Sequence, residues 1–106
     1  MATLPFIQQA TLANNAEFVS RVRQAMIMQA IVTMGKAADL AEGEKAQDRQ
    51  QRRTRYAVEA LRNPDGLVQG MVRAVVTVDT AKEDMTDGEI RQAVRGLWDA
   101  FSEVIL

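Results

Sequence analysis

Apolar residues recur at helical spacing along nearly the whole chain, and only two prolines interrupt it. Pro5 and Pro64 each stand where a helix could begin, and proline is tolerated in a first helical turn. We therefore expect an all-α fold: a single compact helical bundle of four main helices plus a short N-terminal helix. The 106 residues should form one domain (residues 1–106), because a chain of this length buries roughly two thirds of its surface, enough for one core.

Capping signals indicate where these helices begin. The expected helices cover residues from about 5 to 13, 16 to 41, 45 to 62, 64 to 76 and 87 to 106. Thr3, an asparagine at 14 or 15, and Asn63 are the expected caps of the first, second and fourth helices. Thr86 and Glu89 have the spacing of a capping box ahead of the last one.

Two segments leave alternatives open. Across residues 25–34 the apolar side chains wrap most of the way round the second helix, so that helix is buried on several sides or contacts other subunits. Residues 75–78 are rich in valine, which also suits a short strand. The four-residue spacing of Leu67, Met71 and Val75 favours a helix there instead.

The large apolar residues are expected in the core rather than at a binding surface. They are Phe18, Val22, Ala25 and Met26, the further methionines Met28, Met34 and Met71, and the aromatic residues Trp98 and Phe101.

The third helix is strongly basic, with six positive and three negative side chains between residues 44 and 62. One interpretation is a cationic face for an acidic protein surface or for DNA phosphates. The other is a solvated helix whose charges pair locally, for instance Asp48 with Arg52 and Arg55 with Glu59. Arginine rather than lysine dominates from 49 to 55, which favours an ion-paired interface.

An acidic segment (residues 79–89) follows the fourth helix, with Lys82 as its only cation. Its spacing does not match a calcium-binding loop, so a solvated loop and an acidic first helical turn are the simpler interpretation. A third hypothesis joins the two charged surfaces: they suit head-to-tail packing of identical subunits, which closes into rings. Arg52→Glu and Arg53→Glu would then disrupt assembly.

Composition argues against catalysis. The chain contains no histidine and no cysteine, the commonest general base and the usual thiolate ligand. We expect no enzyme activity, no metal, no cofactor and no small-molecule substrate. No apolar run is long enough to span a bilayer, and the first residues lack the basic start of a secretory signal. A helix-turn-helix DNA-binding regulator is the competing class, but a net charge of -1 makes DNA contact the less favoured alternative.

The order of segments resembles a known group of proteins. The segments are Asn15-Ala16-Glu17-Phe18, Arg21-Val22, a long apolar helix, Tyr56 to Pro64, Met71 to Val76, and Thr86 to Ile90 followed by Val94 and Trp98. This order is similar to that of the small all-helical structural proteins of tailed bacteriophages. The resemblance implies a virion component of the head or neck, assembled in the host cytoplasm. Residues 42–55 depart from it, being longer and more basic, so no residue role is carried over.

The role implied by this resemblance is that of a head–tail connector or adaptor, a ring-forming subunit. A capsid decoration (cement) protein or a scaffolding protein is the alternative. The expected partners are copies of the chain itself and the portal, capsid or tail proteins. The residues expected to form the contact surfaces are Arg49, Arg52, Arg53, Arg55, Tyr56, Phe101, Val104, Ile105 and Leu106.

Overall fold

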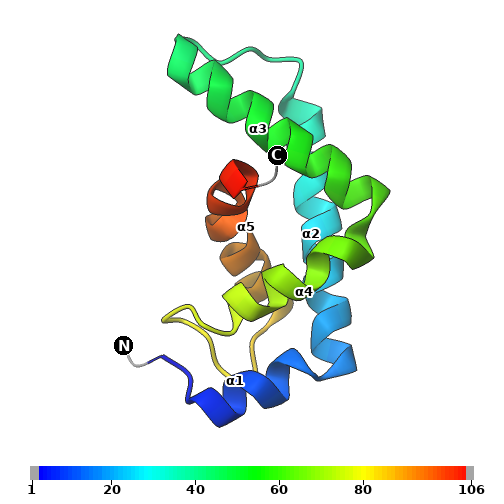
Figure 1. Cartoon of the computed structure of the whole chain (residues 1–106), viewed down its shortest axis with the longest axis vertical. Coiled ribbons are helices and arrows are strands. Elements are labelled where there is room, and N and C mark those ends of the chain that lie inside the picture. Colours follow the sequence, from blue (N-terminus) through cyan, green and yellow to red (C-terminus); the bar gives the residue numbers. More distant parts are fainter. Residues whose placement is uncertain (1–2, 105–106) are drawn as a thin grey trace.

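Five α-helices build the computed structural model, which describes residues 3–104 (Figure 1). They are α1 (Phe6–Ala13), α2 (Ala16–Lys36), α3 (Glu44–Arg62), α4 (Pro64–Val75) and α5 (Asp87–Val104). The described part of the chain contains no strand. The predicted all-α class, with four main helices and a short leading one, is confirmed.

Side-chain caps fix the start of three helices. The Asn15 Oδ1 atom accepts a hydrogen bond of 2.9 Å from the backbone N–H three residues on, at the start of α2. Asn63 does the same for α4 at 3.3 Å. Ahead of α5, the Thr86 hydroxyl accepts from the Glu89 N–H at 3.1 Å, and the Glu89 carboxylate accepts from the Thr86 N–H at 2.9 Å. These predicted caps are confirmed, because each depends only on neighbouring residues.

The structure corrects one expected cap and two expected helix ends. α1 has Pro5 as its N-cap with no side-chain cap, and the Thr3 hydroxyl instead donates to Asp79 at 3.4 Å. α2 ends at Lys36 rather than near residue 41. There Gln50 accepts from the Ala41 N–H at 3.0 Å and donates to the Lys36 carbonyl at 3.3 Å, replacing bonds that a longer helix would make itself. Residues 76–78 form a turn after α4.

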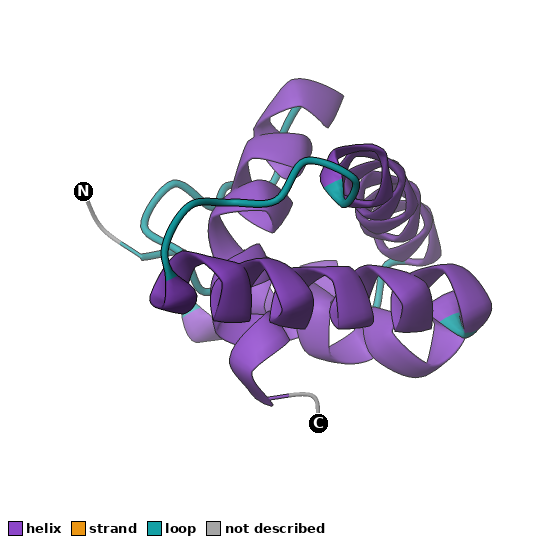
Figure 2. Cartoon of the chain, turned by 90° about the horizontal axis from the view of Figure 1, so that it is seen from above, coloured by secondary structure: helices purple, strands orange, loops and turns teal. Residues whose placement is uncertain are grey.

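The second helix is the central element. α2 contacts α3, α4 and α5 as well as α1, while α1 lies against α4 at one end of the molecule. The fold measures 42 × 29 × 24 Å. Figure 2 looks along the long axis and shows that the helices cross at steep angles rather than running parallel.

The core lies where α2, α3, α4 and α5 meet. Its largest fully buried side chains are Trp98, Tyr56, Met26, Met71, Ile90, Val22, Val72, Val75 and Val94. The rings of Tyr56 and Trp98 pack edge to face with their centroids 4.6 Å apart. An aromatic pair of this geometry contributes about 0.5–1.5 kcal/mol beyond the area it buries.

One part of the fold has no core of its own. No residue between 31 and 55 is buried, although this range holds the last turns of α2, the connection, and most of α3. We call this part the hairpin tip (residues 31–55). It forms the end of the molecule at the top of Figure 1. Its position follows from the sequence, because the first half of α3 is polar and offers no apolar stripe to pack.

Candidate functional site

The hairpin tip exposes large apolar side chains. Ile31 is 58% exposed and Leu40 78%, and Val32 is about half exposed. Met28 and Met34 were predicted to lie in the core and are instead exposed. The reason is that the apolar side chains surround the second half of α2, and only one side of that half faces the rest of the fold.

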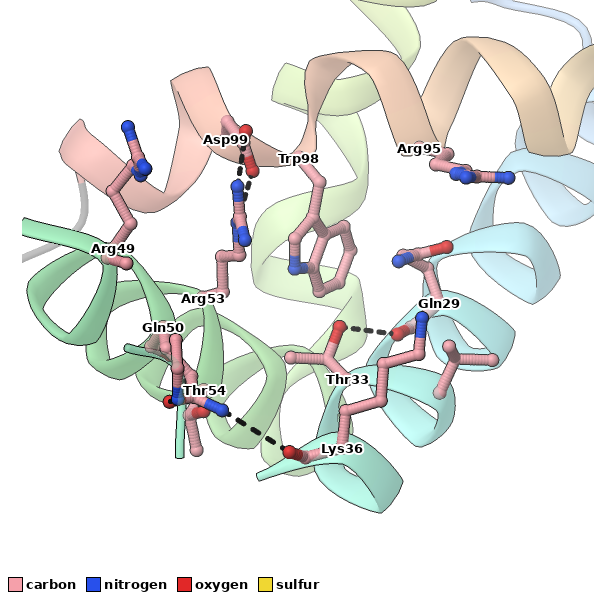
Figure 3. Close-up of a pocket in the computed structure, with 13 residues that line it drawn as sticks. Gln29, Thr33, Lys36, Arg49, Gln50, Arg53, Thr54, Arg95, Trp98 and Asp99 are labelled. Atoms are coloured by element: carbon pink, nitrogen blue, oxygen red, sulfur yellow. Dashed lines mark hydrogen bonds and ion pairs between the residues drawn. The ribbon is translucent and has the colours of Figure 1, made fainter. Parts of the chain in front are cut away.

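A cleft of about 410 Å³ lies beside this surface, between the hairpin tip and α5 (Figure 3). We call it the cationic cleft. Its lining residues are Gln29, Val32, Thr33, Lys36, Ala41, Ala46, Arg49, Gln50, Arg53, Thr54, Arg95, Trp98 and Asp99. The volume falls within the range typical of ligand pockets, 300–1,000 Å³.

One carboxylate and one arginine in the cleft are already paired. Arg53 donates to both oxygens of Asp99, through Nε at 2.5 Å and Nη2 at 2.8 Å. This bond lowers the pKa of Asp99, with a smaller contribution from the charge of Arg49. It also raises the pKa of Arg53. Asp99 is therefore ionised at neutral pH and fixes α3 to α5 across the cleft.

Three other cations in the cleft have no such partner. Lys36, Arg49 and Arg95 form no ion pair within residues 3–104. They come from α2, α3 and α5 and surround the opening in Figure 3. After the Arg53–Asp99 pair is set aside, the lining keeps three positive charges and no negative one. The cleft is thus suited to an anionic group.

The inner wall of the cleft holds a donor without an acceptor. Trp98 is 2% exposed, and its indole nitrogen is buried with no hydrogen-bond partner. Figure 3 shows the ring reaching from α5 into the space between α2 and α3. The hydroxyl of Tyr56, which packs against this ring, is also buried without a partner. Burial raises the pKa of Tyr56 to about 12.

The structure distributes the predicted arginines over three places. Arg49 and Arg53 line the cationic cleft. Arg52 lies with both of them beside a second, smaller hollow of about 240 Å³ at the end of α5. Arg55 borders a shallow apolar hollow that also includes Leu40. The four arginines therefore do not form one continuous face.

Tyr56 has to be removed from the predicted contact surface. Its side chain is fully buried, because the residue faces the core from α3 and packs on Trp98. A partner cannot reach it in this fold. The predicted pairs Asp48–Arg52 and Arg55–Glu59 are likewise not formed, and Glu59 pairs with Arg62 at 2.9 Å.

The predicted apolar contact at the end of α5 is described only in part. Phe101 is half-buried and stacks on Tyr56 with the ring centroids 6.1 Å apart. Val104 is 82% exposed. Ile105 and Leu106 lie outside the described residues.

The acidic segment is partly neutralised within the chain. Asp87 pairs with Arg21 at 2.7 Å, and Glu89 pairs with Lys82 at 3.1 Å. Glu83 and Asp84 are exposed and form no ion pair in the described range.

Sequence reasoning missed Lys36, Arg95, Trp98 and Asp99 as residues of the cleft. Arg95 and Asp99 are four residues apart and so share one face of α5, which was a usable signal. Their closeness to Arg49 and Arg53 depends on how α3 packs on α5, which no local pattern indicates.

The cationic cleft and the hairpin tip present positive charge and apolar side chains, groups that bind anionic and apolar partners. Residues 3–104 contain no group of acidic side chains placed to hold a metal ion. Within the same range, no helix is long and apolar enough to cross a membrane. No protein-family model, curated protein or solved structure matches this chain, so the chemistry of its surface has to indicate the function.

Proposed function

We propose that this chain is a non-enzymatic structural subunit of a tailed-phage virion, a head–tail connector or adaptor that assembles into a ring by protein–protein contacts. The observation that supports it best is the hairpin tip, which holds no fully buried residue and exposes Ile31, Val32 and Leu40. A subunit that works by contact needs such a surface and needs no active site. Its partners would be copies of itself and the portal, capsid or tail proteins.

The exposed apolar side chains of the hairpin tip favour association, because an interface would remove them from water. Moving one large aliphatic side chain from water into a packed interface gains about 1.5–3 kcal/mol. Three such residues within one part of the chain offer more than an isolated surface residue does, and apolar surface that gathers in one region marks interaction sites. Association would bury this apolar surface, which has no cover within the described part of the chain.

The test compares two matched pairs of substitutions by light scattering coupled to size exclusion. Ile31→Ser with Leu40→Ser removes apolar surface from the hairpin tip. Phe6→Ser with Ile7→Ser removes a similar amount from α1, where both residues are also strongly exposed. We expect the first pair to convert oligomers to monomers while circular dichroism stays unchanged. If only the α1 pair had this effect, the contact would lie at the other end of the molecule.

The role in a virion is tested by copy number. Quantitative mass spectrometry of purified phage particles would compare this chain with the portal protein. A number close to that of the portal supports a connector ring. A number close to that of the major capsid protein would indicate a cement protein, and absence from particles would leave a scaffolding role.

A further inference from the structure

We propose that the cationic cleft receives the acidic segment of a second copy of this chain, with Glu83 and Asp84 as the entering carboxylates. The inference rests on the proposed function, because it names the two surfaces that join neighbouring subunits in a ring.

The cationic cleft supplies positive charge and hydrogen-bond donors. Lys36, Arg49 and Arg95 line the cleft from three helices and have no ion-pair partner in the described structure. The one carboxylate present, Asp99, already accepts two hydrogen bonds from Arg53. Trp98 forms part of the inner wall, but its indole nitrogen is buried, so the cations of the lining are the donors that an entering group can reach. A group that enters this cleft therefore meets donors and positive charge, and carboxylates complement both.

The acidic segment supplies the carboxylates. Within the acidic segment, Arg21 and Lys82 already pair with Asp87 and Glu89. Glu83 and Asp84 are left exposed and form no ion pair, and the charge of Lys82, which pairs with Glu89, acts on Asp84 only from a longer distance. They stand next to each other in the connection between α4 and α5, so a single loop can present both. The cleft volume of about 410 Å³ is large enough for two acidic side chains.

The cleft and the acidic segment lie in different parts of the chain. The acidic segment lies in the lower half of the molecule in Figure 1, and the residues that line the cleft belong to elements of the upper half, beside the hairpin tip. No residue of the acidic segment lines the cleft of its own chain, so the two surfaces do not meet within the folded chain. A contact between different surfaces of identical subunits is heterologous, and repeating it produces a closed ring or a filament. The cleft and the segment thus provide the two sides of such a contact.

The experiment uses charge reversal on each side. One variant carries Arg49→Glu with Arg95→Glu in the cleft. A second carries Glu83→Lys with Asp84→Lys in the acidic segment. A control carries Arg62→Glu with Arg73→Glu, two exposed arginines outside both the cleft and the acidic segment that change the net charge as much as the cleft variant does. Circular dichroism checks that all three fold.

We expect each of the first two variants to associate with itself at least about tenfold more weakly than the wild type. Mixing them should restore assembly, because each then meets a partner of opposite charge. The control should assemble like the wild type. The chain has a single tryptophan, and it lines the cleft, so its emission should change on assembly of the wild type and of the mixture.

Three results would overturn the inference. If the cleft variant assembled as well as the wild type, the cleft would not be a contact. If the mixture failed to assemble, the two surfaces would not be partners. Both results leave the proposed function standing, since wild-type oligomers would still form. A wild-type chain that stays monomeric at all concentrations would contradict the inference and the self-assembly proposed above.

Discussion

Tyr56 and Trp98 each bury a polar atom that finds no partner in the described structure. A buried donor without an acceptor costs about 1–3 kcal/mol. The two rings offset that cost by packing edge to face at the centre of the core. The sequence predicts Trp98 as a core residue correctly but places Tyr56 on the surface. The error arises because Tyr56 directly follows the arginine-rich part of α3. Neighbouring residues of a helix point about 100° apart, so Tyr56 faces the core although Arg55 before it is exposed.

Alkaline titration of Tyr56 should report this burial. Its pKa in the folded chain is raised to about 12, whereas a tyrosine in an unfolded chain ionises near 10. The contribution of Tyr56 to folding stability should therefore be constant below pH 10 and be lost as the pH rises from 10 through 12, by roughly 2–3 kcal/mol. Tyr56 is the only tyrosine, so tyrosinate absorbance follows it directly.

The control for this titration is Tyr56→Phe, which keeps the ring and removes the ionisable group. It should flatten the loss of stability between pH 10 and 12, measured by urea denaturation. Ionisation of Tyr56 near pH 10 in a chain that keeps its helical circular dichroism would contradict the prediction.

At the level of the helices, the accuracy of the sequence-based predictions depends on distance along the chain. The caps of α2, α4 and α5 were predictable because each joins residues three apart. The pair Arg53–Asp99 spans 46 positions and forms only once α3 lies beside α5. The apolar residues of α2 were recognised, but their spacing could not show that its last turns extend beyond the core.

The capping box of α5 should have a measurable effect on stability. Thr86→Ala removes the acceptor of the Glu89 N–H and should cost about 1 kcal/mol, within the usual 0.5–2 kcal/mol for such caps. Thr80→Ala is the matched control, because Thr80 is exposed and caps no helix. Urea denaturation of both variants checks this. Equal stabilities would mean that the cap contributes nothing.

Two glycines should respond to alanine with opposite sign. Gly43 precedes α3 with a φ of 91°, a conformation that alanine adopts only under strain, so Gly43→Ala should destabilise the fold by about 1 kcal/mol. Gly96 lies inside α5, and a Cβ there would meet nothing within 4 Å. Gly96→Ala should stabilise by about 0.5–1 kcal/mol. Thermal denaturation gives both values, and a shift of the same sign would contradict the prediction.

On the scale of the whole molecule, a net charge of -1 hides an uneven distribution. Lys36, Arg49 and Arg95 form no ion pair and line the cationic cleft, and Glu83 and Asp84 form none and lie in the acidic segment. The hairpin tip also carries four acidic residues without an ion pair in the described structure, Asp39, Glu42, Glu44 and Asp48. Composition alone gave the near-neutral total, whereas the separation of the two groups follows from the packing of α5 against the hairpin.

This distribution predicts how assembly depends on salt. Charge pairs at the rim of a contact weaken as the screening length falls from about 10 Å at 0.1 M to 3 Å at 1 M salt. Association measured by sedimentation should therefore decrease between 0.1 and 1 M sodium chloride. Association that increased with salt would indicate a contact dominated by the apolar residues of the hairpin tip.

The absence of buried residues between 31 and 55 also has a kinetic consequence. Backbone amides there are protected by helical hydrogen bonds but by no packed core, so they can open without global unfolding. Hydrogen–deuterium exchange should be fast in this range and slow around Met26, Met71 and Val94. Such a segment loses conformational entropy when a neighbour covers it. In such a subunit, residues 31–55 would fluctuate in the monomer and become ordered only in the assembly. Each incoming copy could therefore adjust the conformation of this segment while the contact forms.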